Sequence, residues 1–403
     1  MNRLSVLMSL PRDTKILVLV NALRSFSSAI LSINFSIYLS KLGASAVQIG
    51  LTFTGISLFS AFRGLVEGFI ADRIGRKPLL LYSAGSMLAA GAILVLTDSI
   101  SVLTVAATLF SIGSNIGYTP AVQAILSEKV ATEDRTRTFS INSFFGSAMS
   151  IFGSFVGGLP DVLRSTGLPE IVSYRQTFAI IIVIGALSFS LYMTIKETID
   201  RKELNQNNLI EEVDRDERIF LIKWSGVVAL DEIGGSFNNL ISYWYYLRFG
   251  VGSAQIGALS GVSQFLTLFS YFLGFRMARR FGIIPATALS RIPVVIINIL
   301  TPLMPNFTIV SVIRVTQSLF GMIDVPLRQS YLMGVLKSRR RASALGLVSI
   351  VGRVTSAGAP SISGFLYEYV SLALPFFCAA SFQFASAGLM YLFFKNIKPP
   401  EER

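Results

Sequence analysis

Ten ionisable side chains lie inside long apolar stretches of this sequence, where a charge is costly and is therefore a candidate for function. The sequence has no histidine and one cysteine, Cys378, so the usual metal ligands and many general bases are missing. The chemistry left is the binding of charge, because arginines attract anions and carboxylates exchange protons. The ten are Arg24, Arg63, Glu67, Asp231, Glu232, Arg291, Arg314, Asp324, Arg328 and Arg353.

The deepest of these charges are predicted to carry the function. At about 1.5 Å per residue, Arg24 and Asp231 lie about 15 Å and 18 Å along their stretches, near the middle of a bilayer. The residues predicted for proton coupling or substrate binding are Arg24, Asp231, Glu232, Asp324, Arg328 and Arg353.

Asp324 and Arg328 are four residues apart, with Pro326 between them. A proline removes a backbone donor and frees carbonyl groups, so an acid at a proline kink could bind substrate or a proton. The alternative is an ion pair that only stabilises the kink.

The composition places these charges in a membrane protein. Hydrophobic residues make up 52% and charged residues 14% of the chain, against about 25% charged in ordinary globular proteins, and the mean hydropathy is +0.62. Twelve apolar stretches are long enough to cross a hydrocarbon core of about 30 Å. The sequence predicts an all-α membrane protein whose spans are 14–39, 47–71, 78–97, 100–126, 138–159, 174–195, 219–247, 254–278, 284–303, 307–336, 342–366 and 372–394.

An internal repeat relates the first six spans to the last six. Residues 42–50, LGASAVQIG, return 207 positions later as FGVGSAQIG. So long a period indicates a duplicated domain, as in the parallel repeats of transporters. We expect two pseudo-symmetric six-helix bundles, residues 1–195 and 219–403, joined by a charged cytoplasmic linker, 196–218. The same offset makes Arg24 and Asp231 equivalent positions of the two copies, with opposite charges.

Basic residues outside the spans lie almost entirely on one side, which holds both termini and the linker. Because basic loops stay in the cytoplasm, both termini are predicted to be cytoplasmic, in a multi-pass protein of the cell (plasma) membrane. These loops also account for the net charge of +12, so no nucleic-acid partner is expected. The first stretch is too long for a signal peptide.

The loop after the second span reads GFIADRIGRK, residues 68–77. It resembles the cytoplasmic signature Gly-x-x-x-Asp-Arg-x-Gly-Arg-Lys of the major facilitator superfamily, and the twelve spans and the duplication extend that resemblance over the whole chain. The resemblance implies that this loop latches the two halves on the cytoplasmic side; alternatively, its basic residues only fix the topology. It also implies that the first and seventh spans face each other, so that Arg24 would pair with Asp231 or Glu232 and respond to protonation of the acid, whereas a static pair is the alternative. The predicted gate residues are Gly68, Asp72, Arg73, Gly75, Arg76, Lys77 and a candidate partner, Glu128.

Three weaker signals bear on the substrate. Residues 153–158, GSFVGG, are similar to a Gly-Pro-x-x-Gly-Gly element of proton-driven exporters in that family, with Ser154 in place of proline; small-residue packing is the alternative. Residues 243–246, YWYY, suit an external gate or binding surface, or an interfacial belt. Polar residues on the cavity-lining spans of the family, or else at helix contacts, are Asn34, Asn115, Tyr118, Gln123 and Gln317.

The sequence therefore predicts a secondary active transporter that moves a small organic solute by alternating access, coupled to H⁺. Efflux antiport of drug-like compounds is slightly favoured by residues 153–158, and proton symport of a small organic anion is the alternative suggested by the excess of arginines. A membrane-embedded enzyme or a receptor is the rival from another class. We expect no cofactor, no metal and a monomer whose partners are the solute, H⁺ and the lipid bilayer. No Gly-x-x-x-x-Gly-Lys-Ser/Thr loop is present for ATP.

Overall fold

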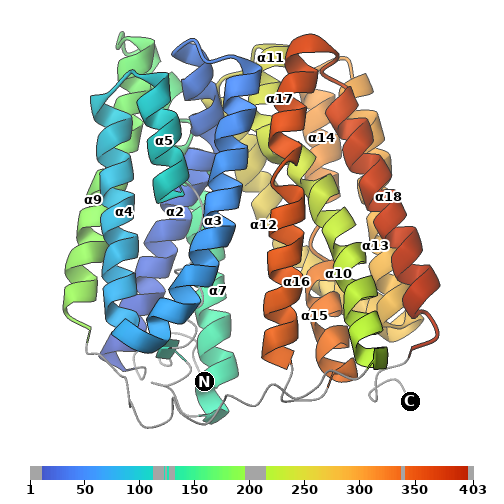
Figure 1. Cartoon of the computed structure of the whole chain (residues 1–403). Coiled ribbons are helices and arrows are strands. Elements are labelled where there is room, and N and C mark those ends of the chain that lie inside the picture. The colour runs from blue at the N-terminus through green and yellow to red at the C-terminus, as the bar shows by residue number, and fades with distance from the viewer. Residues whose placement is uncertain are drawn as a thin grey trace. The chain divides into compact units, whose positions relative to one another are not determined.

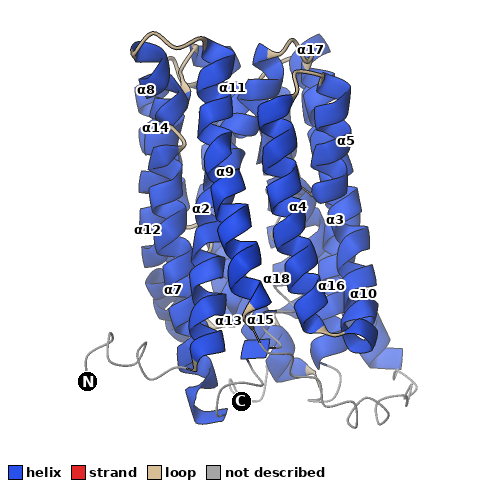
Figure 2. Cartoon of the chain, turned by 90° about the vertical axis from the view of Figure 1, so that its left-hand side faces the viewer, coloured by secondary structure: helices blue, strands red, loops and turns tan. Residues whose placement is uncertain are grey.

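The computed structural model describes residues 11–111, 122, 125–126, 132–195, 215–336 and 341–397. For residues 65–74, 132–137, 216 and 341–343 it describes the backbone alone. The described residues form helices and short connections, with no strand among them (Figure 2).

The predicted spans coincide with described helical residues (Figure 1), except that residues 112–121 and 123–124 of the span predicted at 100–126 lie outside the described part of the chain. Among those residues, eight helical segments are long and apolar enough to cross a membrane, and Ile100–Phe110 is a shorter apolar helix. The predicted all-α fold is thereby confirmed, and the twelve spans agree with it. The first six predicted spans are α2 (Arg12–Lys41), α3 (Ala46–Ile74), α4 (Arg76–Leu96), α5 (Ile100–Phe110), α7 (Thr132–Val156) with α8 (Leu159–Ser165), and α9 (Glu170–Met193).

Several helices of the second six are interrupted. The turn at residues 319–323 divides the tenth predicted span, and the second helix starts at Asp324 itself. The six are α10 (Arg215–Ser236) with η1 (Phe237–Leu240) and α11 (Ile241–Phe249), α12 (Ser253–Phe281), α13 (Ile283–Leu300) with η2 (Thr301–Leu303), α14 (Phe307–Ser318) with α15 (Asp324–Val335), α16 (Arg341–Ser356) with α17 (Ala359–Tyr369), and α18 (Leu374–Phe394).

The expected kink at Pro326 is wrong in detail. Pro326 lies in the first turn of α15, where a backbone N–H has no partner inside the helix, so proline is tolerated there. The interruption precedes it. Asp324 therefore stands at the start of a helix, where a negative charge complements the helix dipole.

The chain forms two compact units. Unit 1 comprises residues 1–43, 59–209 and 252–261, and unit 2 comprises residues 44–58, 210–251 and 262–403. The start of α3 therefore belongs to unit 2, and the start of α12 belongs to unit 1.

In unit 1, α2 packs along α7 and α9, and α4 packs along α9. A buried cluster joins α2 and α4 to the end of α9 through residues such as Leu17, Val20, Ala84 and Tyr192. In unit 2, α10 packs along α16 and α18, and α13 packs along α18 and α15.

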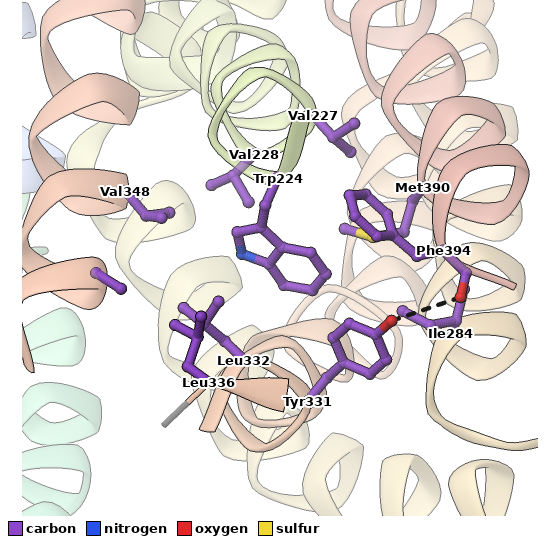
Figure 3. Packing of buried hydrophobic residues seen from close by; sticks show 11 residues of the cluster. Trp224, Val227, Val228, Ile284, Tyr331, Leu332, Leu336, Val348, Met390 and Phe394 are labelled. Carbon is purple, nitrogen blue, oxygen red and sulfur yellow. Dashed lines mark hydrogen bonds between the residues drawn. The ribbon is translucent and has the colours of Figure 1, made fainter. Parts of the chain in front are cut away.

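The corresponding cluster of unit 2 is built around Trp224 of α10 (Figure 3). The Trp224 ring stacks on Tyr331 of α15, with centroids 5.1 Å apart, and the Tyr331 hydroxyl donates to the Phe394 carbonyl at 3.5 Å. Trp224 and Val227 stand 207 residues after Leu17 and Val20, so the two clusters occupy equivalent places in the repeat. Since lipid is as apolar as these side chains, close packing rather than escape from water stabilises such a cluster in a membrane.

The starts of α3 and α12 are capped in the same way. In unit 1, the carboxylate of Asp161 on α8 accepts the backbone N–H of Ala254 at 2.8 Å. In unit 2, the carboxylate of Glu368 on α17 accepts the backbone N–H of Val47 at 2.9 Å. Each acid satisfies a donor left over at a helix N-terminus and complements the helix dipole. Both the acids and the amides are 207 residues apart.

Glycines next to these caps let the helices approach closely. A Cβ on Gly257 of α12 would collide with the Ser154 carbonyl of α7, and one on Gly50 of α3 with the Pro360 carbonyl of α17. The glycines shared by the two copies of the repeat therefore make equivalent helix contacts in the two units.

Candidate proton and substrate site

A cluster of buried charges joins three helices of unit 2. Arg291 of α13 contacts Asp231 of α10 at 2.5 Å and Asp324 of α15 at 2.6 Å, measured from Nη2 to Oδ2. Arg328 of α15 contacts the same two oxygens at 3.1 Å and 2.5 Å. Each guanidinium therefore bridges both carboxylates, and each carboxylate is shared by two arginines. We call these four residues the charge cluster.

The charge cluster is sealed from solvent. Its side chains are 12% exposed or less, and Asp324 is fully buried. Within the described part of the chain, the Oδ1 atoms of Asp231 and Asp324 have no hydrogen-bond partner. Buried charges of this kind are stable only when paired, and removal of one partner leaves the others uncompensated. The free Oδ1 atoms are places where a proton can be accepted.

The helices explain how the cluster is held. Asp324 and Arg328 lie one turn apart on the same face of α15, and Asp324 lies in its first turn. Asp231 lies two turns beyond Trp224 on α10, which the aromatic cluster fixes against α15.

Two further charges lie next to the cluster. Glu232 follows Asp231 on α10, is exposed, and interacts electrostatically with Arg328 and with Arg353 of α16. Arg353 is exposed as well. Asp231, Glu232 and Asp324 thus balance Arg291, Arg328 and Arg353, and the group is neutral while all six are charged.

The structure brings together five of the six residues predicted for coupling, and Arg24 belongs to unit 1. Arg24 is 7% exposed, and its Nη1 donates to the Ser83 carbonyl of α4 at 3.4 Å. Its pairing with Asp231 or Glu232 stays a prediction. Arg291 is among the ten candidate charges of the sequence but not among the six residues predicted for coupling, although it is the single charge in an otherwise apolar span and that was the available signal.

Comparison with known proteins identifies the family. The family model described as Major Facilitator Superfamily matches residues 17–229 and 225–403. The chain belongs to the major facilitator superfamily. It is accordingly a multi-pass membrane transporter and not an enzyme.

Relatives within the superfamily are distant. An uncharacterized membrane protein of Saccharomyces cerevisiae is 22% identical over 393 residues, which cover 88% of each chain. Azole resistance protein 1 of the same yeast is 28% identical over 215 residues, or 51% of this chain and 33% of that protein. A crystal structure of the nucleoside transporter NupG matches with a TM-score of 0.73 and 13% identity, over 96% of this chain and all of that one, and so shares the fold.

The superfamily signature loop is described in part. Gly75 precedes α4 with φ of 108°, and its equivalent Gly282 precedes α13 with φ of 84°, both in the region that favours glycine. The Nζ of Lys77 donates to the Met193 carbonyl at the end of α9, at 2.8 Å, where a cation complements the helix dipole. Arg76 begins α4. Only the backbone is described for Gly68, Asp72 and Arg73, and Glu128 lies outside the described residues, so the gating role of these residues stays a prediction.

Of the polar residues predicted to line a cavity, two are described. Asn34 is fully buried, and its amide donates to the Gly157 carbonyl at 2.8 Å and to Ile30 of its own helix. It therefore makes a helix contact between α2 and the end of α7. Gln317 is half-buried and donates to the Val294 carbonyl at 3.2 Å. Asn115, Tyr118 and Gln123 lie outside the described residues.

The glycines of residues 153–158 make close contacts inside unit 1. A Cβ on Gly153 would collide with the backbone of Phe26, and one on Gly158 with Ala254. Packing accounts for these small residues. In the aromatic run, Tyr243, Trp244 and Tyr245 are each 4% exposed or less, so these three pack inside unit 2 instead of forming an interfacial belt.

Proposed function

We propose that this superfamily member is a proton-coupled transporter of a small organic solute, and that Asp231 and Asp324 carry the coupling proton. The observation that supports this is the charge cluster, in which two buried carboxylates share two guanidiniums and each keeps one oxygen without a hydrogen-bond partner in the described part of the chain.

Protonation of either aspartate would remove one negative charge from a balanced group. One charge pair at about 4 Å contributes on the order of 4 kcal/mol at an effective dielectric constant of 20. Losing it could change a two-state equilibrium by about 1,000-fold, since 1.36 kcal/mol corresponds to a factor of ten. The cluster holds α10, α13 and α15 together, so its release would alter the packing of these three helices.

Alternating access would carry this local change across the membrane. We propose that the six-helix halves, residues 1–195 and 219–403, are the moving bodies, with both termini in the cytoplasm and the loop of Gly75 on that side. We also propose that the protein is a monomer and that it lies in the cell membrane, as the sequence predicts. Export is the favoured direction, supported by the name of the relative Azole resistance protein 1.

Proteoliposomes containing a pH-sensitive dye test the coupling. Addition of an azole or of benzoate to the full chain should move protons, and Asp231→Asn or Asp324→Asn should reduce the signal to that of empty liposomes. The matched control is Asp98→Asn, because Asp98 is 62% exposed and pairs with Arg175 outside the cluster.

Solute flux is followed in the same vesicles. If the two cluster variants move protons as the wild type does, the assignment of the proton to these aspartates is wrong. If neither probe crosses the membrane with the wild type at any pH gradient, transport of such solutes is wrong as well.

A further inference from the structure

Another arginine of unit 2, Arg314, lies in a predicted span and has no carboxylate partner among the described residues. Arg314 of α14 is half-buried, and among the described residues it makes no ion pair. An unbalanced cation at this depth is costly, so its retention calls for a reason. It differs in this from Arg291 and Arg328, which Asp231 and Asp324 neutralise.

The polar contacts of Arg314 are neutral. Its Nη1 donates to Asn298 Oδ1 of α13 at 3.0 Å, and Gln317 Nε2 reaches the same oxygen at 3.4 Å. The Asn298 amide donates in turn to Gln383 Oε1 of α18 at 2.8 Å. This chain of amides fixes the guanidinium between α13 and α14 and leaves its charge uncompensated.

Two tyrosines of neighbouring helices interact electrostatically with the same guanidinium. Tyr245 of α11 interacts with Arg314 through its side chain, and Tyr367 of α17 lies within electrostatic range of both. Tyr367 is 8% exposed, and within the described chain its hydroxyl has no hydrogen-bond partner. A buried hydroxyl without a partner costs free energy that an acceptor atom would recover. The ring of Phe307 packs against Tyr245 with centroids 5.5 Å apart, which adds an apolar wall.

We propose that Arg314, with the hydroxyls of Tyr367 and Tyr245, binds the carboxylate of an organic anion that the protein transports. One guanidinium balances one negative charge, whereas a doubly charged phosphate would leave a net charge in the membrane. The carboxylate would accept from Arg314 and from the unpaired Tyr367 hydroxyl. This assignment rests on the proposed transport function and adds the class of solute and its binding residues.

The competing explanation is that Arg314 only ties α14 to α13 through Asn298. Tyr367→Phe separates the two, because it keeps the ring and deletes a hydroxyl that has no hydrogen-bond partner among the described residues. A purely structural network would lose nothing in that variant. Binding of a carboxylate would lose one hydrogen bond to a charged acceptor, or about tenfold in apparent affinity.

Thermal unfolding of the purified full chain provides the test, with benzoate, neutral benzamide and cationic benzylammonium as probes of matched size. Benzoate alone should raise the Tm of the wild type. Arg314→Gln should remove that increase, and Tyr367→Phe should shift the benzoate titration to about tenfold higher concentration. The matched control is Tyr391→Phe, since Tyr391 is 43% exposed on α18.

The proposal is overturned if benzoate gives no increase, if benzamide or benzylammonium gives an equal one, or if Arg314→Gln or Tyr367→Phe binds benzoate as the wild type does. The flux assay keeps the two proposals apart. Benzoate binding that needs Arg314 without any flux would refute transport and leave the site, while azole-driven proton flux that persists in Arg314→Gln would leave coupling intact.

Discussion

The capped helix starts follow the internal repeat, whereas the charge cluster departs from it. At the caps, Asp161 and Glu368 do the same work on Ala254 and Val47, and all four follow the offset of 207. In the charge cluster the offset relates unlike residues. Arg291 corresponds to Ala84, which is fully buried in the hydrophobic cluster of unit 1.

The same contrast holds elsewhere in the cluster. At the offset of 206 that applies to α15, Arg328 corresponds to Val122, which is also part of the apolar cluster of unit 1. Positions filled by small apolar side chains in one unit thus hold an ion network in the other. The comparison teaches that the two units share their helix contacts and differ in the positions at which they bury charge.

The largest effect is expected when Arg291 is replaced by alanine, the residue at the equivalent position, Ala84, of unit 1. Arg291→Ala leaves both aspartates with one guanidinium, which should abolish coupled transport and lower stability by about 3–5 kcal/mol. Chemical unfolding and proteoliposome flux measure the two effects. Arg164→Ala is the control, because the Arg164 side chain is 53% exposed and its ion pairs should contribute less than about 1 kcal/mol. If Arg164→Ala lost as much transport and stability as Arg291→Ala, the special role of the charge cluster would be contradicted.

A balanced replacement sharpens the same point. Asp231→Asn with Arg328→Gln removes one charge of each sign, so the double variant should be more stable than the sum of the single losses predicts, by about 0.5–3 kcal/mol. Proton flux should stay absent in the double variant, because the Asp231 carboxylate is gone. Strict additivity in a double-mutant cycle would show that the two side chains do not act together.

A smaller effect is expected at the caps. Asp161→Ala should lower stability by about 1 kcal/mol, since one helix N-terminus loses its acceptor. Glu368→Ala should act in the same direction and less, because its contact is exposed. Thermal unfolding of each variant compares them, with Asp161→Asn to separate hydrogen bonding from charge. If one substitution lowered the Tm and the other raised it, the two acids would not have the same role.

The smallest effect should come from Lys77→Met. This change removes the bond to the Met193 carbonyl and a cation at the end of α9, which contributes about 0.3–1 kcal/mol. Thermal unfolding at low and high salt tests it, because salt screens such a contact in the wild type and not in the variant. A salt response identical in the two proteins would exclude the electrostatic contribution.

Features that depend on local sequence could be predicted. Apolar length predicted the spans, and the internal repeat predicted a duplicated domain. The shared offset of 207 also relates the two hydrophobic clusters once the structure shows them. Four-residue spacing also gave the pair of Asp324 and Arg328.

Features that depend on the meeting of distant helices could not. Arg291 finds its partners on α10 and α15, 60 and 33 residues away, and no local pattern encodes that. Asn34 looked like a cavity residue because it is polar in an apolar span, yet the Gly157 carbonyl at the end of α7 takes its amide. The break at residues 319–323 precedes the proline that seemed to mark it, because proline fits the first turn of a helix.

The exchanged starts of α3 and α12 have a consequence for biosynthesis. Unit 1 needs residues 252–261, so it cannot be completed when the ribosome has finished the first six spans. Residues 44–58, made early, must wait for the last third of the chain before unit 2 can receive them. We therefore expect each unit to be completed only after most of the chain has been made, and we expect the two fragments produced by a cut in the linker to stay associated, because each unit contains residues from both.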